Sequence, residues 1–476
     1  MDELHIHDLQ SVSLMTASGI FYNITYIQIS IGINGFPQCV VSLSTGGTLH
    51  IDEATNIKAP TFPLLDEDCD LCYKLDGDTH VLFSGYIAGE QSSIQSTTDI
   101  IHSTRTYRIA CVSEKIDAVP PMAVRYLSNA VAASQQVLHN FIMVTNNAKT
   151  GASKALNSQS GNNDDVGGLI LRSLSDIQGG VTHGQSSPFS EYIATDKIQL
   201  NIKSLATTTL LKYVVDGLTS LIIGGNSYYS ALLRLCQDLH LSLVPKVQEK
   251  GTMMCISHCN PWAKPDKIFI TPSEYTAIGL SNMSRQSTTI DGIVVPNNGD
   301  TTAPTTNFYT FYGQYKGKDG QIHTVTKDTL AQLSKTTSLK FAQRPLPSWL
   351  KGVATDRKDA IERICKEYFA QEALTQQQLT LTIPTFGFTT PTLEEVFEYV
   401  GKTLEIWCPA KDNVDLYNIE KHDKYYAFCQ NVTFTMSLLP KYIDTRINLS
   451  LSHVRNPELQ EALGFNSDAD LLYSVS

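Results

Sequence analysis

Two segments near opposite ends of the chain carry the same pattern of strands. Residues 79–113 and 424–455 each predict an extended strand, a short polar connection and a second, alternating strand. In the earlier segment Tyr107, Ile109 and Cys111 take the apolar positions of the second strand. A strand with one face in water requires this period of two, and in the later segment the apolar face is formed by Ile443, Thr445, Ile447, Leu449 and Leu451. A β module carried twice, roughly 300 residues apart, predicts a chain that supplies two equivalent pieces to one symmetric assembly.

Length and charge limit the class of protein. A chain of 476 residues exceeds the size of a single hydrophobic core, so roughly two to four domains are expected. The net charge of -11 argues against a surface that grips nucleic acid, because phosphate contacts need Lys and Arg. An acidic lining would still let DNA pass without specific binding.

The sequence shows no export or membrane signal. No apolar run approaches the roughly 20 residues that span a bilayer, and the start MDELHIHDLQ lacks the basic and apolar regions of a signal peptide. We therefore expect a protein that is made in the cytoplasm and has no membrane contact. The ten cysteines are scattered, mostly at apolar positions, where reduced thiols behave as small hydrophobic side chains.

Strand patterns define a first domain at residues 1–117. Residues 26–33 alternate strongly, and a turn at Asn34 leads to a second strand at 39–43, which predicts a hairpin. With the first of the repeated strand pairs, these segments form one antiparallel β domain. Residues 118–165 follow, with a helix expected at 122–142 and a polar loop after it.

Residues 166–350 form a mixed middle domain. The segment 227–241 has apolar residues at helical spacing, and short strands are expected at 243–244, 253–256 and 267–270. Residues 281–305 are polar and predict a loop.

The last domain covers residues 351–476. It starts with a helix at 356–373, and residues 379–383 then alternate as a strand. A capping-box start predicts a second helix at 393–400, followed by a strand at 404–408 and the repeated strand pair.

Several of these segments resemble one protein family. They are VLFSGYIAG (81–89), SYYSALLRLCQDLHLSLVP (227–245) with TMMCISH (252–258), GKTLEIWCPA (401–410), and the repeated pair that begins YYAFCQNVTFTMSL at Tyr425. Their order resembles the central hub protein of phage tail baseplates. It is also similar to the equivalent portion of the spike proteins of type VI secretion and related contractile injection systems.

The resemblance implies a fold and an assembly. The expected fold is α+β and β-rich, with two tube-like antiparallel β-sandwich or barrel domains flanking a mixed α/β middle region. It implies a homotrimer whose six tube-like domains give pseudo-sixfold symmetry and join a tail tube to a central spike. The expected partners are tail-tube or tape-measure-proximal proteins, the spike and other baseplate proteins. The expected location is the virion, after assembly in the host cytoplasm.

The resemblance also indicates which elements contact neighbouring subunits or the tube. These are the strand pairs around 83–87 and 428–434. The interface residues expected on this basis are Phe83, Tyr86, Ile87, Tyr107, Phe428, Val432, Phe434, Ile447 and Leu449.

Two cysteine motifs invite a chemical role. Cys69 and Cys72 have metal or redox spacing, and Cys255, His258 and Cys259 form the nearest second group. One isolated pair seldom closes a tetrahedral site, so free thiols are the favoured interpretation and no metal or cofactor is expected. His258 and Cys259 would point to opposite faces of a strand, which argues against a thiol nucleophile.

The carboxylates at 356–362 and 394–398 are paired as glycoside hydrolysis requires, but helix-start charge and solvation also explain them. We therefore expect no catalytic residues and no enzyme. The alternatives are a tail-associated cell-wall-degrading enzyme with its site in 166–350, a hub of a bacterial contractile injection system, and a surface adhesin.

Overall fold

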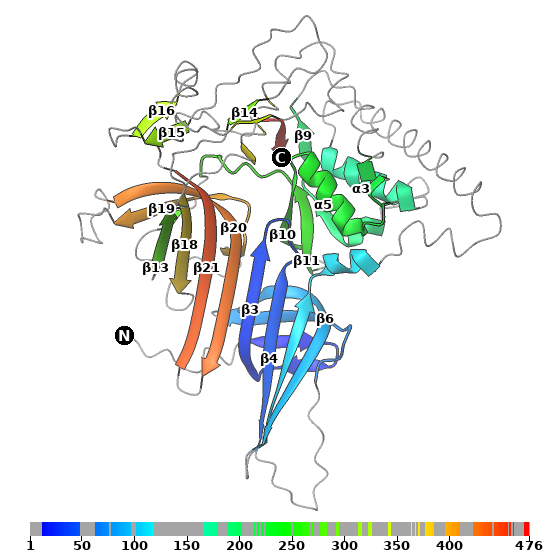
Figure 1. The fold of residues 1–476 in the computed structure, drawn as a ribbon. Coiled ribbons are helices and arrows are strands. Elements are labelled where there is room, and N and C mark those ends of the chain that lie inside the picture. The colour runs from blue at the N-terminus through cyan, green and yellow to red at the C-terminus, as the bar shows by residue number, and fades with distance from the viewer. Residues whose placement is uncertain are drawn as a thin grey trace, which may run out of the picture.

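One large antiparallel sheet dominates the computed structural model (Figure 1). The structure describes residues 12–47, 62–75, 78–96, 101–118, 165–178, 188–201, 214, 217–218, 220–222, 224–248, 251–265, 269–270, 277–282, 292–294, 313–316, 322–325, 341–343, 363, 367, 370–371, 377–384, 396–409, 422–439, 442–455, 457, 460 and 471–475. The sheet has 13 strands, and its main path runs β13-β18-β21-β20-β3-β4-β7-β6-β5-β1-β2. The prediction of a β-rich chain is confirmed.

The N-terminal part of the sheet is a unit of five antiparallel strands, called module 1 below. Its spatial order is β3-β4-β7-β6-β5, and the short strands β1 (Ser13–Thr16) and β2 (Gly19–Phe21) extend it beyond β5. Isoleucines on alternate positions of β3 face the core, which is why this segment is a strand. The bounds are β3 Ile24–Gly32, β4 Gln38–Gly47, β5 Asp68–Leu75, β6 Asp78–Ser96 and β7 Ile101–Ala110.

The C-terminal part is a second unit of five strands, called module 2. Its spatial order is β13-β18-β21-β20-β19, and all four pairings are antiparallel. Numbered along the chain, both modules therefore have the order 1-2-5-4-3. A two-residue strand, β12 (Phe269–Ile270), adds to β19 in parallel. The bounds are β13 Ala277–Asn282, β18 Gln377–Pro384, β19 Thr403–Pro409, β20 His422–Leu439 and β21 Tyr442–Arg455.

The repeated strand pairs predicted from the sequence are the hairpins β6–β7 and β20–β21. Both carry a register shift at the corresponding point, between Ile87 and Gly89 in β6 and between Cys429 and Asn431 in β20. A β-bulge at the same place in each hairpin makes the two modules similar in register as well as in strand order.

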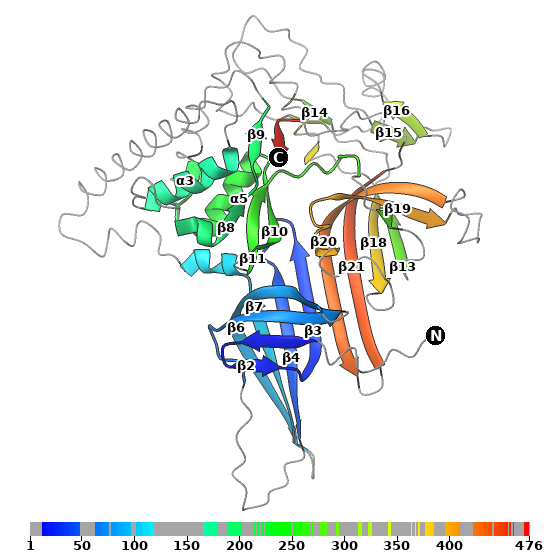
Figure 2. The same cartoon turned by 180° about the vertical axis from the view of Figure 1, so that it is seen from behind.

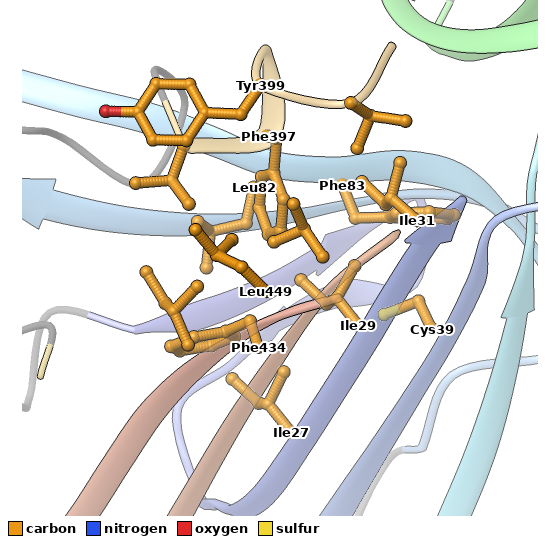
Figure 3. Packing of buried hydrophobic residues seen from close by; sticks show 14 of the residues in the cluster. Ile27, Ile29, Ile31, Cys39, Leu82, Phe83, Phe397, Tyr399, Phe434 and Leu449 are labelled. Carbon is orange, nitrogen blue, oxygen red and sulfur yellow. The ribbon is translucent and has the colours of Figure 1, made fainter. Parts of the chain in front are cut away.

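A single hydrophobic cluster runs through both modules. Figure 3 shows Phe434 and Leu449 of module 2 beside Ile27 and Ile29 of module 1. All four side chains are at most 1% exposed. The two modules therefore share one core, although the sequence predicts two separate β domains.

The middle of the chain packs against module 1 (Figures 1 and 2). Helix α5 (Tyr228–Asp238) begins after Ser227, whose side chain accepts a hydrogen bond from the Ser230 backbone N–H. A sheet of order β10-β11-β8 follows, and all seven residues of β11 are buried. The bounds are α3 Val166–Gln178, β8 Ile193–Thr195, β10 Ser242–Gln248 and β11 Gly251–Ser257, with 3-10 helices η2 Val112–Ala118 and η3 Pro188–Glu191.

Three two-stranded sheets complete the described structure. Strand β9 pairs with β22 near the C-terminus, β14 pairs with β17, and β15 pairs with β16. The bounds are β9 Ile198–Leu200, β14 Gly292–Val294, β15 Gly313–Lys316, β16 Ile322–Val325, β17 Phe341–Gln343 and β22 Tyr473–Val475. Across the part of the chain that the structure describes, no helix is long and apolar enough to cross a membrane.

The loop predicted at 281–305 is partly wrong. Strand β13 extends to Asn282, and β14 lies inside the predicted loop. Both strands are too short to show a clear period, and pairing with β18 and β17 defines them. The helix expected at 122–142 and the polar loop after it lie outside the described residues, except for Asp165. The domain boundaries stay predictions.

Candidate assembly interface

The two modules of one chain meet edge to edge. Strand β3 pairs with β20 in antiparallel register, from Gly32 opposite Asn431 to Tyr26 opposite Ser437. We call this pairing the internal joint. The sequence predicts both strands but not their pairing. Ser30 and Thr433, which lie opposite each other in this joint, are 403 residues apart in the sequence.

The core face of the internal joint is apolar. Every second residue of each strand contributes to this face, and each of these side chains is at most 3% exposed: Ile27, Ile29, Ile31, Val432, Phe434 and Met436. Full burial of one such side chain contributes about 1.5–3 kcal/mol. This face therefore adds apolar packing along the joint.

The opposite face of the internal joint is polar. The Ser30 hydroxyl lies 3.4 Å from the Thr433 hydroxyl, and it donates to Oδ1 of Asn431 at 3.3 Å. At the end of the joint Gly32 faces Asn431, and a Cβ on Gly32 would lie only 2.9 Å from the Asn431 Oδ1. A side chain at this position would therefore displace the Asn431 amide.

The bulge in β20 marks a change of partner on one side of the strand. Before the bulge, β20 pairs with β19 through Phe428 and earlier residues. After the bulge, the same side pairs with β3. In β6 the segment before the bulge also has a partner on this side, because the residues up to Tyr86 pair with β5. After its bulge, β6 pairs with β7 on one side. None of the described strands occupies the other side.

This open side of β6, from Gly89 to Ser96, is the first free edge. Four consecutive residues there, Glu90 to Ser93, are exposed. Glu90 forms an ion pair of 2.8 Å with Arg105 of β7. An exposed edge with polar and charged residues resists random strand pairing.

The second free edge belongs to β13, the first strand of the path. Strand β13 pairs with β18 on one side, and no described strand lies on its other side. In module 1 the corresponding strand is β3, whose outer side forms the internal joint. Among the described strands, the two modules thus form one joint, and the strand segments that correspond to the two sides of that joint, β13 and the end of β6, are open. Apart from the polar residues of β6, nothing in the sequence indicates which strand edges are joined and which are open.

The middle region fixes one end of the internal joint. In the turn after β3, Asn34 has a φ of 63°, and its side-chain Oδ1 accepts from the Leu243 backbone N–H at 2.9 Å. The Asn34 N–H donates to the Leu243 carbonyl at 2.8 Å, and the Ile33 N–H donates to the Gln430 carbonyl at 3.1 Å. One turn therefore connects β10, β3 and β20.

The interface residues expected from the resemblance are mostly core residues of the chain itself. Eight of them belong to the shared hydrophobic cluster: Phe83, Ile87, Tyr107, Phe428, Val432, Phe434, Ile447 and Leu449. The ninth, Tyr86, is partly exposed, and Lys115 Nζ lies 4.6 Å from its ring centre. These side chains shape the strands from inside. Their role in contacts with other subunits stays a prediction.

The cysteine motifs do not form a common centre in the described structure. Burial, with the nearby carboxylates, raises the pKa of the Cys69 thiol to about 12 and that of Cys72 to about 11. Burial likewise raises the pKa of Cys255 to about 12. His258 forms a buried pair with Glu367 at 2.8 Å. Among the described residues, no three His, Cys, Asp or Glu side chains are grouped as a metal site requires.

No protein-family model matches this chain, and no curated protein matches it. Among solved structures, the chain is similar to the 43 kDa tail protein of prophage MuSo2 from Shewanella oneidensis, with a TM-score of 0.43, 10% identity and 94% and 99% of the two chains covered. It is similar to the tail protein from Neisseria meningitidis MC58, with a TM-score of 0.44, 9% identity and coverage of 95% and 98%. It is also similar to a Francisella PdpA-VgrG complex, with a TM-score of 0.36, 9% identity and coverage of 93% and 52%.

These are tail and spike proteins, the same kinds of protein that the sequence patterns resemble. Function and assembly do not follow from likenesses with TM-scores below 0.5.

Proposed function

We propose that this protein is a structural hub of a virion tail baseplate and acts by assembly rather than by catalysis. Three copies form a ring with pseudo-sixfold symmetry between a tail tube and a central spike. The observation that carries the proposal is the repeated module. One chain contains the same five-strand topology twice, and the two copies are already joined through β3 and β20.

Two equivalent modules per chain suit a ring. Each chain contributes the strands β13-β18-β21-β20-β3-β4-β7-β6, in which β13 has one free edge and β6, beyond its bulge, has a free edge of a different kind. Unlike edges that join head to tail produce a closed ring or an open filament. A ring is favoured because closure removes exposed strand edges, which promote aggregation. Three chains then supply six modules, the number that matches a sixfold tube.

The position in the particle follows from the resemblance found in the sequence. One face of the ring meets the tail tube or tape-measure-proximal proteins, and the other meets the spike and other baseplate proteins. The net charge of -11 suits a channel that DNA passes through without specific binding. A hub in a bacterial contractile injection system would use the same ring in a different particle.

Native mass spectrometry of the purified full-length chain tests the proposal. A trimer has three times the 52.5 kDa mass of one chain. A stable monomer at micromolar concentration would overturn the ring. A peptidoglycan zymogram tests the catalytic alternative, and a cleared band at the position of the chain would replace assembly with wall degradation as its function.

A further inference from the structure

The internal joint gives the register of a second joint that one chain cannot make alone. We propose that the free edge of β6 pairs in antiparallel register with β13 of a second copy of this chain, with Gln91 opposite Ser281 of that copy. The inference rests on the proposed ring and adds the contact that closes it.

Strand β6 of module 1 corresponds to β20 of module 2. The bulges align the two strands. Just before the bulge of module 1, Ile87 pairs with Ile109, and just before the bulge of module 2, Cys429 pairs with Leu451. Counting from the bulge, Gly89 corresponds to Asn431. Gln91 then corresponds to Thr433, and Ser92 corresponds to Phe434.

Strand β3 corresponds to β13, and the strands beside them give the alignment. Cys39 of β4 pairs with Ile109, and Leu379 of β18 pairs with Leu451. Because Ile109 and Leu451 correspond, Cys39 and Leu379 also correspond. Ile29 lies opposite Cys39, and Leu280 lies opposite Leu379. Ile29 therefore corresponds to Leu280, and Ser30 to Ser281.

The two free edges can pair in the register of the internal joint. In the internal joint Thr433 lies opposite Ser30. The same geometry places Gln91 opposite Ser281 of the second copy, Ser92 opposite its Leu280, and Ser93 opposite its Gly279. No adjustable shift enters, because both bulges and both outer strands give the same alignment.

The edge of β6 suits main-chain recognition by an added strand. Glu90, Gln91, Ser92 and Ser93 are all exposed, so a partner strand would reach the backbone between them. In an added strand the main-chain hydrogen bonds supply most of the affinity. Module 1 replaces the buried Phe434 of the internal joint with the exposed Ser92. A polar edge of this kind stays soluble before assembly.

The occupant is a second copy rather than the same chain. β13 is the first strand of the path, and six strands separate it from β6: β18, β21, β20, β3, β4 and β7. In both views they lie on opposite sides of the joint between β20 and β3 (Figures 1 and 2). The strand that corresponds to β3 is therefore available to β6 only from another molecule.

Disulfide trapping in the full-length chain tests the register. The variant Gln91→Cys with Ser281→Cys, mildly oxidised, should shift on a non-reducing gel from the mass of one chain to those of two and three. Either single substitution, and the unsubstituted chain, should give no shift, because the nine described native cysteines are free and eight of them are buried.

Two matched variants make the result specific. Ser30→Cys with Thr433→Cys lies at the corresponding place in the internal joint, so it should form a disulfide within one chain and keep the mass of one chain. Gln91→Cys with Leu280→Cys is out of register by one residue, and neighbouring strand positions point to opposite faces, so it should not cross-link.

The outcomes separate the two proposals. Suppose that the protein is trimeric by native mass spectrometry, and that Gln91→Cys cross-links between chains with Ser281→Cys but not with Leu280→Cys. This result supports both the ring and the register. A trimer with no cross-link, or with the Leu280 variant cross-linked instead, would overturn this register and leave the hub in place. A monomer without any cross-link would overturn both.

Discussion

Replacing Phe434 by alanine tests whether the apolar face of the internal joint holds the modules together. Phe434 is 1% exposed and lies between Ile29 of β3 and Ile447 of β21. Removing a buried Phe side chain costs about 3–5 kcal/mol, from the lost transfer free energy and the cavity left behind. Because the cavity would open at the contact between β3 and β20, most of this loss should appear as local separation of the two strands.

Hydrogen exchange read by mass spectrometry measures that local opening directly. A loss of 3–5 kcal/mol raises the opening constant by roughly two to three and a half powers of ten. Peptides that cover β3 and the second half of β20 should exchange faster by this factor. The urea midpoint of the whole chain should fall as well.

The matched control is Ser92→Ala, at the corresponding position of module 1. Ser92 is exposed, so its substitution should change stability by no more than about 0.5 kcal/mol. If Phe434→Ala left exchange in β3 unchanged, or if Ser92→Ala had an equal effect, the apolar face would not be what joins the modules.

Two further changes test the packing of the chain. Gly85→Ala should destabilise the β6–β7 hairpin by about 1–3 kcal/mol, since the new Cβ would lie 2.0 Å from the carbonyl oxygen of Ala110. Gly35→Ala, which meets nothing within 4 Å, is the control, and equal urea midpoints for the two variants would refute the steric argument. Burial alone would raise the pKa of Glu367, but the charge and hydrogen bond of His258 outweigh it and hold that pKa below its ordinary 4.5. The resulting stability is present above pH 4.5 and is lost as the pH falls through the lowered value, so Glu367→Gln should flatten the urea midpoint below pH 4.5, and an unchanged pH profile would exclude this pair as the cause.

The sequence predicts the local pattern of the modules well. The alternation of Ile27, Ile29 and Ile31 identifies β3, and the alternation at 443–451 identifies β21, because a half-buried strand leaves a period of two in the sequence. The predicted repeat corresponds to real hairpins, and their shared bulge adds detail that hydrophobic periodicity does not record.

The joints are not predictable in the same way. A strand with one apolar face can pair with any suitable edge, and the β3–β20 contact connects residues 403 apart. The short β13 has only Ile278 and Leu280 as apolar alternating residues, so its role depends on β18 beside it. The interface residues expected from the resemblance are mostly apolar, and eight of them lie in the core.

An electron micrograph of the purified particle, viewed along its axis, tests the central claim most directly. Class averages should show a closed ring of six similar lobes around a channel, which separates into three pairs at higher resolution. An open filament, or a ring in which the two halves of each chain form unlike lobes, would contradict a hub built from three chains with two equivalent modules each.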